Sequence, residues 1–195
     1  MNQTSKNLWA KMAVIDKRKL YWVLLILLVI PYLFSIGFPI TVSSSTKSLY
    51  NFINPLGPDD VCVFSIDGDV SGWSEVLPGE IAIIKHFMRQ GVKFVVWGAT
   101  SDISMTWEEI KRHIPETNNL EYGVDYVYIG YLAGGETTIK ALSEDIRSVI
   151  KADAYGTPIT ELKLMETVRS WRDISFIVST AHGETPLTYS KHWYS

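Results

Sequence analysis

The pattern of apolar positions divides the chain into an N-terminal apolar segment and a longer region of mixed character. From Leu20 to Thr46 there is no charged residue and no histidine, and from Leu20 to Val42 nearly every residue is apolar or aromatic. A helix over residues 20–42 would reach roughly 34 Å, enough to cross a hydrocarbon core of about 30 Å. A signal peptide has a much shorter apolar core. The pattern therefore predicts an uncleaved transmembrane helix with a kink at Pro31.

Beyond residue 60 the pattern changes to that of a globular domain, in which short apolar runs alternate with segments of helical period. Strands are expected at 61–66, 92–97, 124–132 and 174–179, and helices at 78–90, 106–114, 136–150 and 162–168. Continuous apolar strands separated by helices are typical of parallel βαβ units whose sheet is covered on both faces. We therefore expect an α/β fold, in which one N-terminal transmembrane helix precedes a small doubly wound, Rossmann-like parallel-sheet domain.

The distribution of charge orients the predicted membrane helix. Basic residues cluster just before it, at Lys17, Arg18 and Lys19, whereas the first basic residue after it is Lys47. Since basic residues favour the cytoplasmic side, the N-terminus should be cytoplasmic and the following domain outside the cytoplasm, at the cell membrane. The expected organisation is a basic cytoplasmic segment (1–19), a transmembrane helix (20–42), a membrane-proximal linker (43–60) and an α/β domain (61–195).

Composition narrows the possible functions. A formal net charge of −3 provides no basic surface of the kind that binds nucleic acid. The one cysteine, Cys62, lies in an apolar run, where a cysteine usually serves as a small buried hydrophobic residue. Four histidines are scattered along the chain without the spacing of metal ligands, so their positions indicate no metal site.

Candidate chemistry lies where predicted strands end, because ligands of parallel sheets bind beyond the carboxyl ends of the strands. The first strand ends in Asp67-Gly-Asp69, which resembles the first motif of haloacid-dehalogenase-type phosphohydrolases. The resemblance implies Asp67 as nucleophile, Asp69 as general acid and Mg²⁺ to neutralise the phosphate, with Thr100 and Ser101 as the second motif. The lysine and the later pair of acids that this chemistry requires are not evident. The alternative is that Asp67 and Gly68 form a structural turn.

Two other segments follow predicted strands. Gly134 and Gly135 end a stretch with the spacing of a phosphate-binding loop, but Glu136 occupies the position of its lysine. A carboxylate there repels a polyphosphate, which leaves a small anion as the expected ligand or a purely structural role for Glu136 in the first helical turn. His182, after the last strand, is a further candidate for ligand binding, with a solvated loop histidine as the alternative.

A longer resemblance runs from Tyr122 to Thr185. The strings Tyr-Gly-Val-Asp-Tyr-Val-Tyr-Ile-Gly-Tyr, Gly-Gly-Glu, Glu-Asp-Ile-Arg and Asp-Ala-Tyr-Gly-Thr-Pro resemble an uncharacterised group of membrane-anchored prokaryotic proteins. The resemblance implies a leading membrane segment and brings no catalytic residues, because the group has no assigned activity. Its members continue into more α/β sequence, so this chain is either a shortened relative or obtains part of its domain elsewhere. The aromatic residues Tyr189, Trp193 and Tyr194 would then border an edge that awaits a partner.

Two classes of function are consistent with these patterns. The favoured class is a single-pass membrane-anchored α/β binding or assembly module, whose partners are the lipid bilayer and either a membrane protein or further copies of the chain. The alternative is a metal-assisted phosphohydrolase-like enzyme that uses Asp67 and Asp69. Mg²⁺ belongs only to that alternative, and the sequence indicates no other cofactor.

Overall fold

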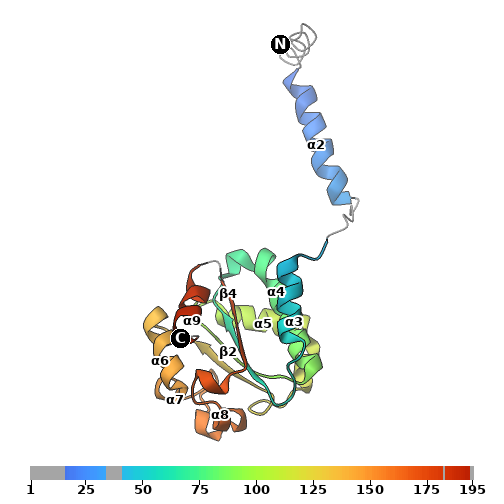
Figure 1. Ribbon diagram of the computed structural model, residues 1–195. Helices are drawn as coiled ribbons and strands as arrows, with labels where there is room; N and C mark the ends of the chain where they lie inside the picture. The colour runs from blue at the N-terminus through green and yellow to red at the C-terminus, as the bar shows by residue number, and fades with distance from the viewer. Residues whose placement is uncertain (1–15, 34–40, 182, 194–195) are drawn as a thin grey trace. The chain divides into compact units, whose positions relative to one another are not determined.

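The computed structural model of the protein describes residues 16–33, 41–181 and 183–193 (Figure 1). The chain divides into two compact units, Met1–Ser43 and Ser44–Ser195. All the strands of the described residues belong to the second unit.

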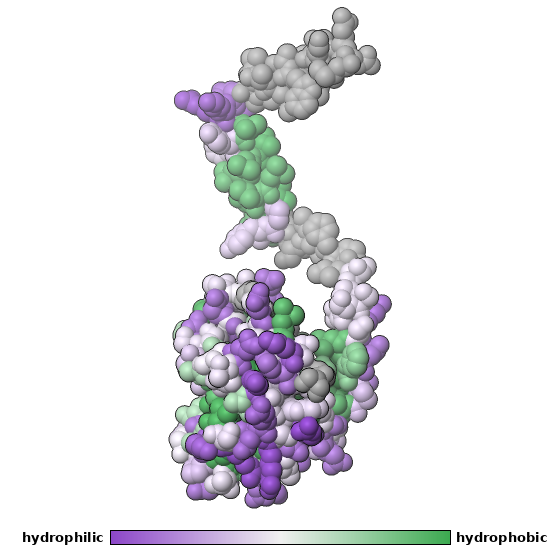
Figure 2. All heavy atoms as spheres, turned by 60° about the vertical axis from the view of Figure 1, so that its left-hand side comes forward, coloured by the Kyte–Doolittle hydropathy of each residue, from purple (hydrophilic) through white to green (hydrophobic). Residues whose placement is uncertain are grey.

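The first unit contains one described helix, α2 (Lys17–Leu33), which lies within the segment that the sequence predicts to cross a membrane. None of its residues is buried, and large apolar side chains such as Trp22 and Leu28 are about two-thirds exposed, at 66% and 65%. Figure 2 shows the most hydrophobic part of this helix in green. Among the described residues, no helix is long and apolar enough to cross a membrane. The predicted span also includes residues 34–40, which lie outside the described part of the chain.

The second unit alternates strands with helices. Its strands are β1 (Val61–Ile66), β2 (Lys93–Gly98), β3 (Tyr126–Tyr131) and β4 (Phe176–Thr180). Its α-helices are α3 (Ser44–Ile53), α4 (Trp73–Gln90), α5 (Ile103–His113), α6 (Gly135–Glu144), α7 (Ile146–Val149), α8 (Lys163–Thr167) and α9 (Thr185–Trp193). Single 3-10 turns occur at η1 (Val70–Gly72), η2 (Pro115–Asn119), η3 (Ile159–Glu161) and η4 (Trp171–Asp173).

The strands form one parallel sheet in the order β3-β2-β1-β4. Every residue of β1 is buried, as expected for a continuous apolar strand with helices on both sides. The chain moves outward from β1 to β3 and then crosses back, so that β4 lies on the other side of β1. The strand order therefore reverses between β1 and β4, where ligands of such sheets bind. The predicted α/β fold with a Rossmann-like parallel sheet is confirmed.

Helices cover both faces of this sheet (Figure 1). The helices α3, α4 and α5 lie on one face, and α6 to α9 lie on the other. Alternate residues of each strand point to opposite faces, so that Phe64 and Phe94 pack under the first group of helices while Val63 and Val95 pack under the second. This alternation gives the sheet two separate cores, one on each face.

The helix predicted over residues 136–150 is interrupted at Asp145. This residue has an extended backbone, with φ −154° and ψ 103°, and its carboxylate accepts the N–H of Arg147 at 3.0 Å to cap α7. The Arg147 guanidinium donates to the carbonyl of Glu166 at 2.8 Å, which fixes α7 against the end of α8. An aspartate that competes for backbone N–H groups can end a helix while the apolar period continues.

Most other boundaries shift by one to three residues, whereas the start of α4 and the expected linker differ more. The helix expected to begin at Pro78 begins at Trp73, so that Pro78 lies inside α4. The segment expected as a linker contains α3, which begins at Ser44 and buries Ile53 in the core of the second unit.

Candidate functional site

The carboxyl ends of three strands meet at Asp67, the residue that comes directly after β1. Its Oδ1 accepts the backbone N–H of Ala99 at 2.7 Å, and its Oδ2 accepts the hydroxyls of Ser65 and Ser179, each at 2.7 Å. Ser65 belongs to β1, Ala99 comes directly after β2 and Ser179 belongs to β4. These four residues form what we call the Asp67 cluster, which joins the strands at the point where the strand order reverses.

The environment of Asp67 opposes its charge. Burial raises the pKa of this carboxyl, and the hydrogen bonds from Ala99, Ser65 and Ser179 offset only part of that effect. A nucleophilic carboxylate must direct an oxygen at its substrate. Here one oxygen is held by an amide and the other by two hydroxyls, so the geometry favours a structural role for Asp67.

A chain of hydrogen bonds extends from the Asp67 cluster into the core. Because the Ser65 hydroxyl donates to Asp67, it accepts from the Tyr189 hydroxyl, at 2.9 Å. The Tyr189 hydroxyl in turn accepts the indole N–H of Trp97 at 2.8 Å, and burial raises the pKa of Tyr189. Tyr189 and Trp193 are each only 3% exposed and fill the core beneath α9. Tyr194, the third aromatic residue of this segment, lies outside the described residues.

The other candidates of the haloacid-dehalogenase-like pattern hold the surrounding loops. Asp69 caps η1, since its Oδ1 accepts the Ser71 hydroxyl at 2.5 Å and the Gly72 N–H at 3.2 Å. Thr100 accepts the N–H of Asp102 at 3.4 Å, and the Ser101 hydroxyl donates to the Asp102 carboxylate at 3.3 Å. Asp67, Asp69, Thr100 and Ser101 thus lie at the same end of the sheet, but their side chains are engaged within the loops.

Several residues of this region carry no motif that a sequence would reveal. Asp102 accepts the Val70 N–H at 3.2 Å and so links the loop after β1 to the loop after β2. Glu80 of α4 is fully buried, and its Oε1 accepts the Thr180 hydroxyl at 2.5 Å. A glutamate on the apolar side of a helix is the one signal that could have drawn attention to Glu80.

The alternative function requires Mg²⁺ near Asp67, and the groups present there do not suit this ion. Mg²⁺ binds carboxylate oxygens directly and keeps several waters, whereas both Asp67 oxygens already accept protein hydrogen bonds. Within residues 16–33, 41–181 and 183–193, no group of three or more His, Cys, Asp or Glu side chains is arranged to hold a metal ion. His182, the remaining candidate, lies outside the described residues.

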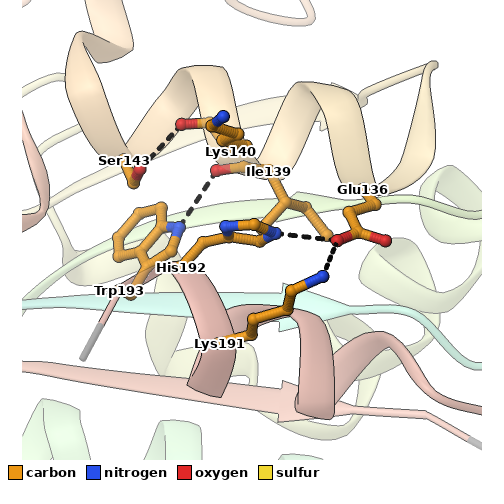
Figure 3. Close-up of polar contacts among 7 residues, drawn as sticks. All are labelled: Glu136, Ile139, Lys140, Ser143, Lys191, His192 and Trp193. Atoms are coloured by element: carbon orange, nitrogen blue, oxygen red, sulfur yellow. Dashed lines mark hydrogen bonds and ion pairs between the residues drawn. The ribbon is translucent and has the colours of Figure 1, made fainter. Parts of the chain in front are cut away.

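The predicted anion site at the start of α6 is occupied by contacts within the protein. Gly134 and Gly135 both have positive φ, at 109° and 53°, and form the turn into α6. The Glu136 carboxylate points toward α9, where it accepts Lys191 Nζ at 2.7 Å and contacts His192 Nε2 at 2.8 Å (Figure 3). These partners lower the pKa of Glu136 to about 2. These three side chains link α6 to α9 where the sequence places a candidate anion site.

Comparisons with protein family models, with curated proteins and with solved structures found no significant match to this chain. The resemblance of residues 122–185 to uncharacterised membrane-anchored proteins therefore stays a prediction.

Proposed function

We propose that this protein is a single-pass membrane-anchored α/β module that binds or assembles with a membrane partner. The observation that carries the proposal is the exposed apolar surface of α2, which the described part of the chain leaves uncovered along its whole length. Apolar surface in water costs about 25 cal/mol per Å². A lipid bilayer would remove this cost, and the apolar sequence continues from α2 to Val42.

The distribution of charge supports an outward orientation of the second unit. The basic residues at the start of α2, Lys17, Arg18 and Lys19, favour the cytoplasmic side of the bilayer. The α/β unit would then lie outside the cytoplasm, where cytoplasmic nucleotides are not available to it.

The geometry at the carboxyl ends of the strands supports binding or assembly over catalysis. Asp67 holds three strands together, Asp69 caps η1 and Glu136 pairs with α9. No observation favours the phosphohydrolase alternative, because each of these carboxylates holds part of the protein in place. A phosphate ester incubated with the full chain and Mg²⁺ should therefore be hydrolysed no faster by the native protein than by Asp67→Asn.

The membrane anchor is tested by washing isolated membranes with alkaline carbonate. The native chain should stay in the membrane pellet, whereas the double variant Leu24→Arg, Leu28→Arg should be released. Each arginine near the centre of a membrane helix costs about 2.5–3.5 kcal/mol on insertion scales. Met105→Lys, which places a charge on an exposed apolar residue of the α/β unit, is the matched control and should be retained. Release of the native chain would overturn the proposal.

The orientation is tested by labelling single cysteines in a Cys62→Ala background. Ser148→Cys on the exposed surface of α7 should react with an impermeant maleimide in intact cells. Ser5→Cys, in the basic N-terminal segment, should react only after the cells are opened. The reverse result would contradict an α/β unit outside the cytoplasm. A chain that, after gentle extraction, runs as a lone monomer and binds nothing would contradict the assembly role.

A further inference from the structure

The sheet has two edge strands, β3 and β4, and β3 is covered by its own chain. The N–H of Ala154 donates to the carbonyl of Tyr128 at 3.0 Å, and the N–H of Gly123 donates to the carbonyl of Tyr126 at 2.9 Å. Both carbonyls belong to β3 and face away from β2. Two outward carbonyls of β3 therefore have partners within the chain, and we call this side of the sheet the closed edge.

Asp153 holds this cover in place. Its Oδ2 accepts the Tyr122 hydroxyl at 2.6 Å, and its Oδ1 accepts the N–H groups of Tyr155 and Thr157 at 2.9 Å and 2.8 Å. The side chain is buried in the turn that it forms. One carboxylate thus fixes both segments that lie along β3.

The edge of β4 is built differently. The N–H of Asp67 donates to the carbonyl of Thr180, so Thr180 faces β1. Because alternate residues of a strand face opposite sides, the backbone groups of Ile177 and Ser179 face away from β1. In the part of the chain that the structure describes, no backbone hydrogen bond from another element reaches these groups. We call this the open edge.

A groove of about 340 Å³ runs along the open edge, between Leu49 of α3 and the α9 residues Pro186 and Ser190. Phe52 lies one helical turn from Leu49, and Leu187 lies one turn from Ser190. Phe52 is 69% exposed and Leu187 is 68% exposed, more than any other large apolar side chain described in the α/β unit. The two helices that border the groove, α3 and α9, therefore each carry one strongly exposed apolar side chain.

The strand β4 lacks the features that usually prevent an edge strand from pairing with another chain. Natural edge strands are usually protected by lysine, by proline or by a bulge. The strand β4 reads Phe-Ile-Val-Ser-Thr, and its pairing with β1 has a regular register. An uncharged strand can also face an identical strand across a two-fold axis without repulsion between like charges.

Because β3 is covered, the closed edge limits which strand of a second molecule can pair with β4. If both edges were open, β3 of one molecule could add to β4 of the next, and the chain would form filaments. Because the Ala154 and Gly123 contacts occupy β3, that head-to-tail arrangement is blocked. Pairing of β4 with β4 remains, and it closes after two copies.

We propose that the open edge binds the same edge of a second copy, so that two antiparallel β4 strands join the sheets into one. With the two-fold axis at Val178, Ile177 of each copy lies opposite Ser179 of the other, and all outward backbone groups of these residues are paired. Phe52 and Leu187 of the two copies are covered at the same time. The dimer rests on the proposed assembly role, for which it makes a second copy of the chain the partner. It does not depend on the membrane anchor.

Disulfide cross-linking tests the predicted register. Residues that face each other at a non-hydrogen-bonded position have Cα atoms about 4.5 Å apart, within the range of about 4.4–6.8 Å for disulfides. In full-length chain carrying Cys62→Ala, Val178→Cys should form a disulfide-linked dimer on mild oxidation. Tyr131→Cys, at the exposed end of the closed edge, is the control and should not. Equal cross-linking of the two variants, or cross-linking of neither, would overturn the proposal.

Oligomeric mass provides a test that leaves the strand unchanged. The native chain in detergent should have twice the protein mass of the 22.1 kDa monomer. The double variant Phe52→Lys, Leu187→Lys should raise the dimer dissociation constant about tenfold or more, since like charges then face each other across the axis. The control pair Met105→Lys, Ser148→Lys alters exposed positions elsewhere on the α/β unit and should stay dimeric. A monomeric native chain, or equal effects of both pairs, would contradict β4 pairing.

These outcomes are independent of the test of the membrane anchor. A chain that is released by carbonate but forms the Val178→Cys disulfide would contradict the anchor and support the dimer. A chain that is retained in the membrane but gives no disulfide would support the anchor and contradict the dimer.

Discussion

The two edges of the sheet differ in how their backbone groups are satisfied, although both strands are short and neither carries a charge. Along β3, the N–H groups of Ala154 and Gly123 donate to the outward carbonyls of Tyr128 and Tyr126. Along β4, the neighbouring elements α3 and α9 form the walls of a groove and leave the strand between them accessible. A closed edge needs a dedicated segment of chain, and the chain provides one only for β3 among the described residues.

The same comparison applies to the carboxylates that hold each edge strand. Asp153 binds a segment across the outer side of β3, whereas Asp67 binds β4 to its inner neighbours through Ser65, Ser179 and the loop after β2. Both carboxylates receive three neutral donors. One excludes an additional strand, while the other fixes an edge strand and leaves its outer side accessible.

Asp153→Ala should have the largest effect, because it removes the closed edge. Three donors lose their acceptor at a buried position, which should lower the free energy of unfolding by about 3 kcal/mol. Urea denaturation of the full chain in detergent measures this loss. Asp153→Asn keeps an acceptor for the backbone N–H groups and should lose less than Asp153→Ala. Equal losses would contradict the assigned role of the Oδ1 contacts.

Opening the closed edge should also change assembly. If β3 is accessible in Asp153→Ala, head-to-tail pairing with β4 becomes possible, and species larger than a dimer should form. Light scattering at increasing concentration measures this growth. A variant that unfolds more easily but never exceeds the mass of a dimer would show that the cover does not limit assembly.

Asp67→Ala should have the next largest effect, since it removes the side-chain links that join β4 to β1 and to the loop after β2. Three hydrogen bonds are lost, but a desolvated charge is removed as well, so the free energy of unfolding should fall by about 2 kcal/mol. Thermal unfolding followed by circular dichroism measures the change. The control Ser101→Ala alters an exposed hydroxyl at the same end of the sheet and should unfold like the native chain.

The pH dependence identifies the contribution of Asp67. Its pKa in the folded state lies above the ordinary value, so the folded protein binds this proton more tightly than the unfolded chain. As the pH falls through the raised pKa toward the ordinary value, this group therefore adds stability. The native chain should show that gain and Asp67→Ala should not. A parallel pH profile for both would contradict a buried, desolvated carboxyl at this position.

The sequence was sufficient for the inner part of the sheet and insufficient for its edges. Val61–Ile66 was predicted as a strand with the boundaries observed, because a buried parallel strand is apolar throughout. The closed edge depends on Asp153, whose pairing with Tyr122 joins residues far apart in the chain. Such pairs leave no local period, so the position of the turn around Tyr155 against β3 was not predictable.

The contacts of the candidate site were likewise only partly predictable from the sequence. The position of Asp67 at a strand end was predictable from the apolar run before it, but its partner Ser179 lies on another strand with no motif of its own. Glu136 was expected in the first turn of its helix, and Lys191 and His192 become its partners only because α9 packs against α6. The sequence therefore indicated where the charged side chains lie along the chain, whereas tertiary packing determines which partners they contact.

Tyr122→Phe should have a smaller effect on the closed edge. The variant loses one hydroxyl that donates to Asp153 at 2.6 Å, while the backbone N–H groups of Tyr155 and Thr157 still donate to Asp153. The free energy of unfolding should fall by about 1 kcal/mol, the usual contribution of a single hydrogen bond. The double variant Tyr122→Phe, Asp153→Ala should lose little more than Asp153→Ala alone. Fully additive losses would show that the two side chains act separately.

Glu136→Gln should have the smallest effect and should act on the open edge through α9. The Glu136 pKa of about 2 lies below the ordinary value because Lys191 and His192 stabilise its charge. This contribution is therefore present above the unfolded pKa and is lost as the pH falls from about 4.5 toward 2. The indole N–H of Trp193 donates to the carbonyl of Ile139 at 3.1 Å, so the part of the tryptophan fluorescence that is lost in Trp193→Phe measures the contact of α9 with α6. In the native chain that signal should change over this acid range, whereas Glu136→Gln should already resemble the acid form at neutral pH.

Added salt should weaken the native contact and leave Glu136→Gln unchanged, because an exposed ion pair is screened. An identical acid transition in both proteins would mean that α9 is held by its buried aromatic residues and that the ion pair contributes nothing to the wall of the groove.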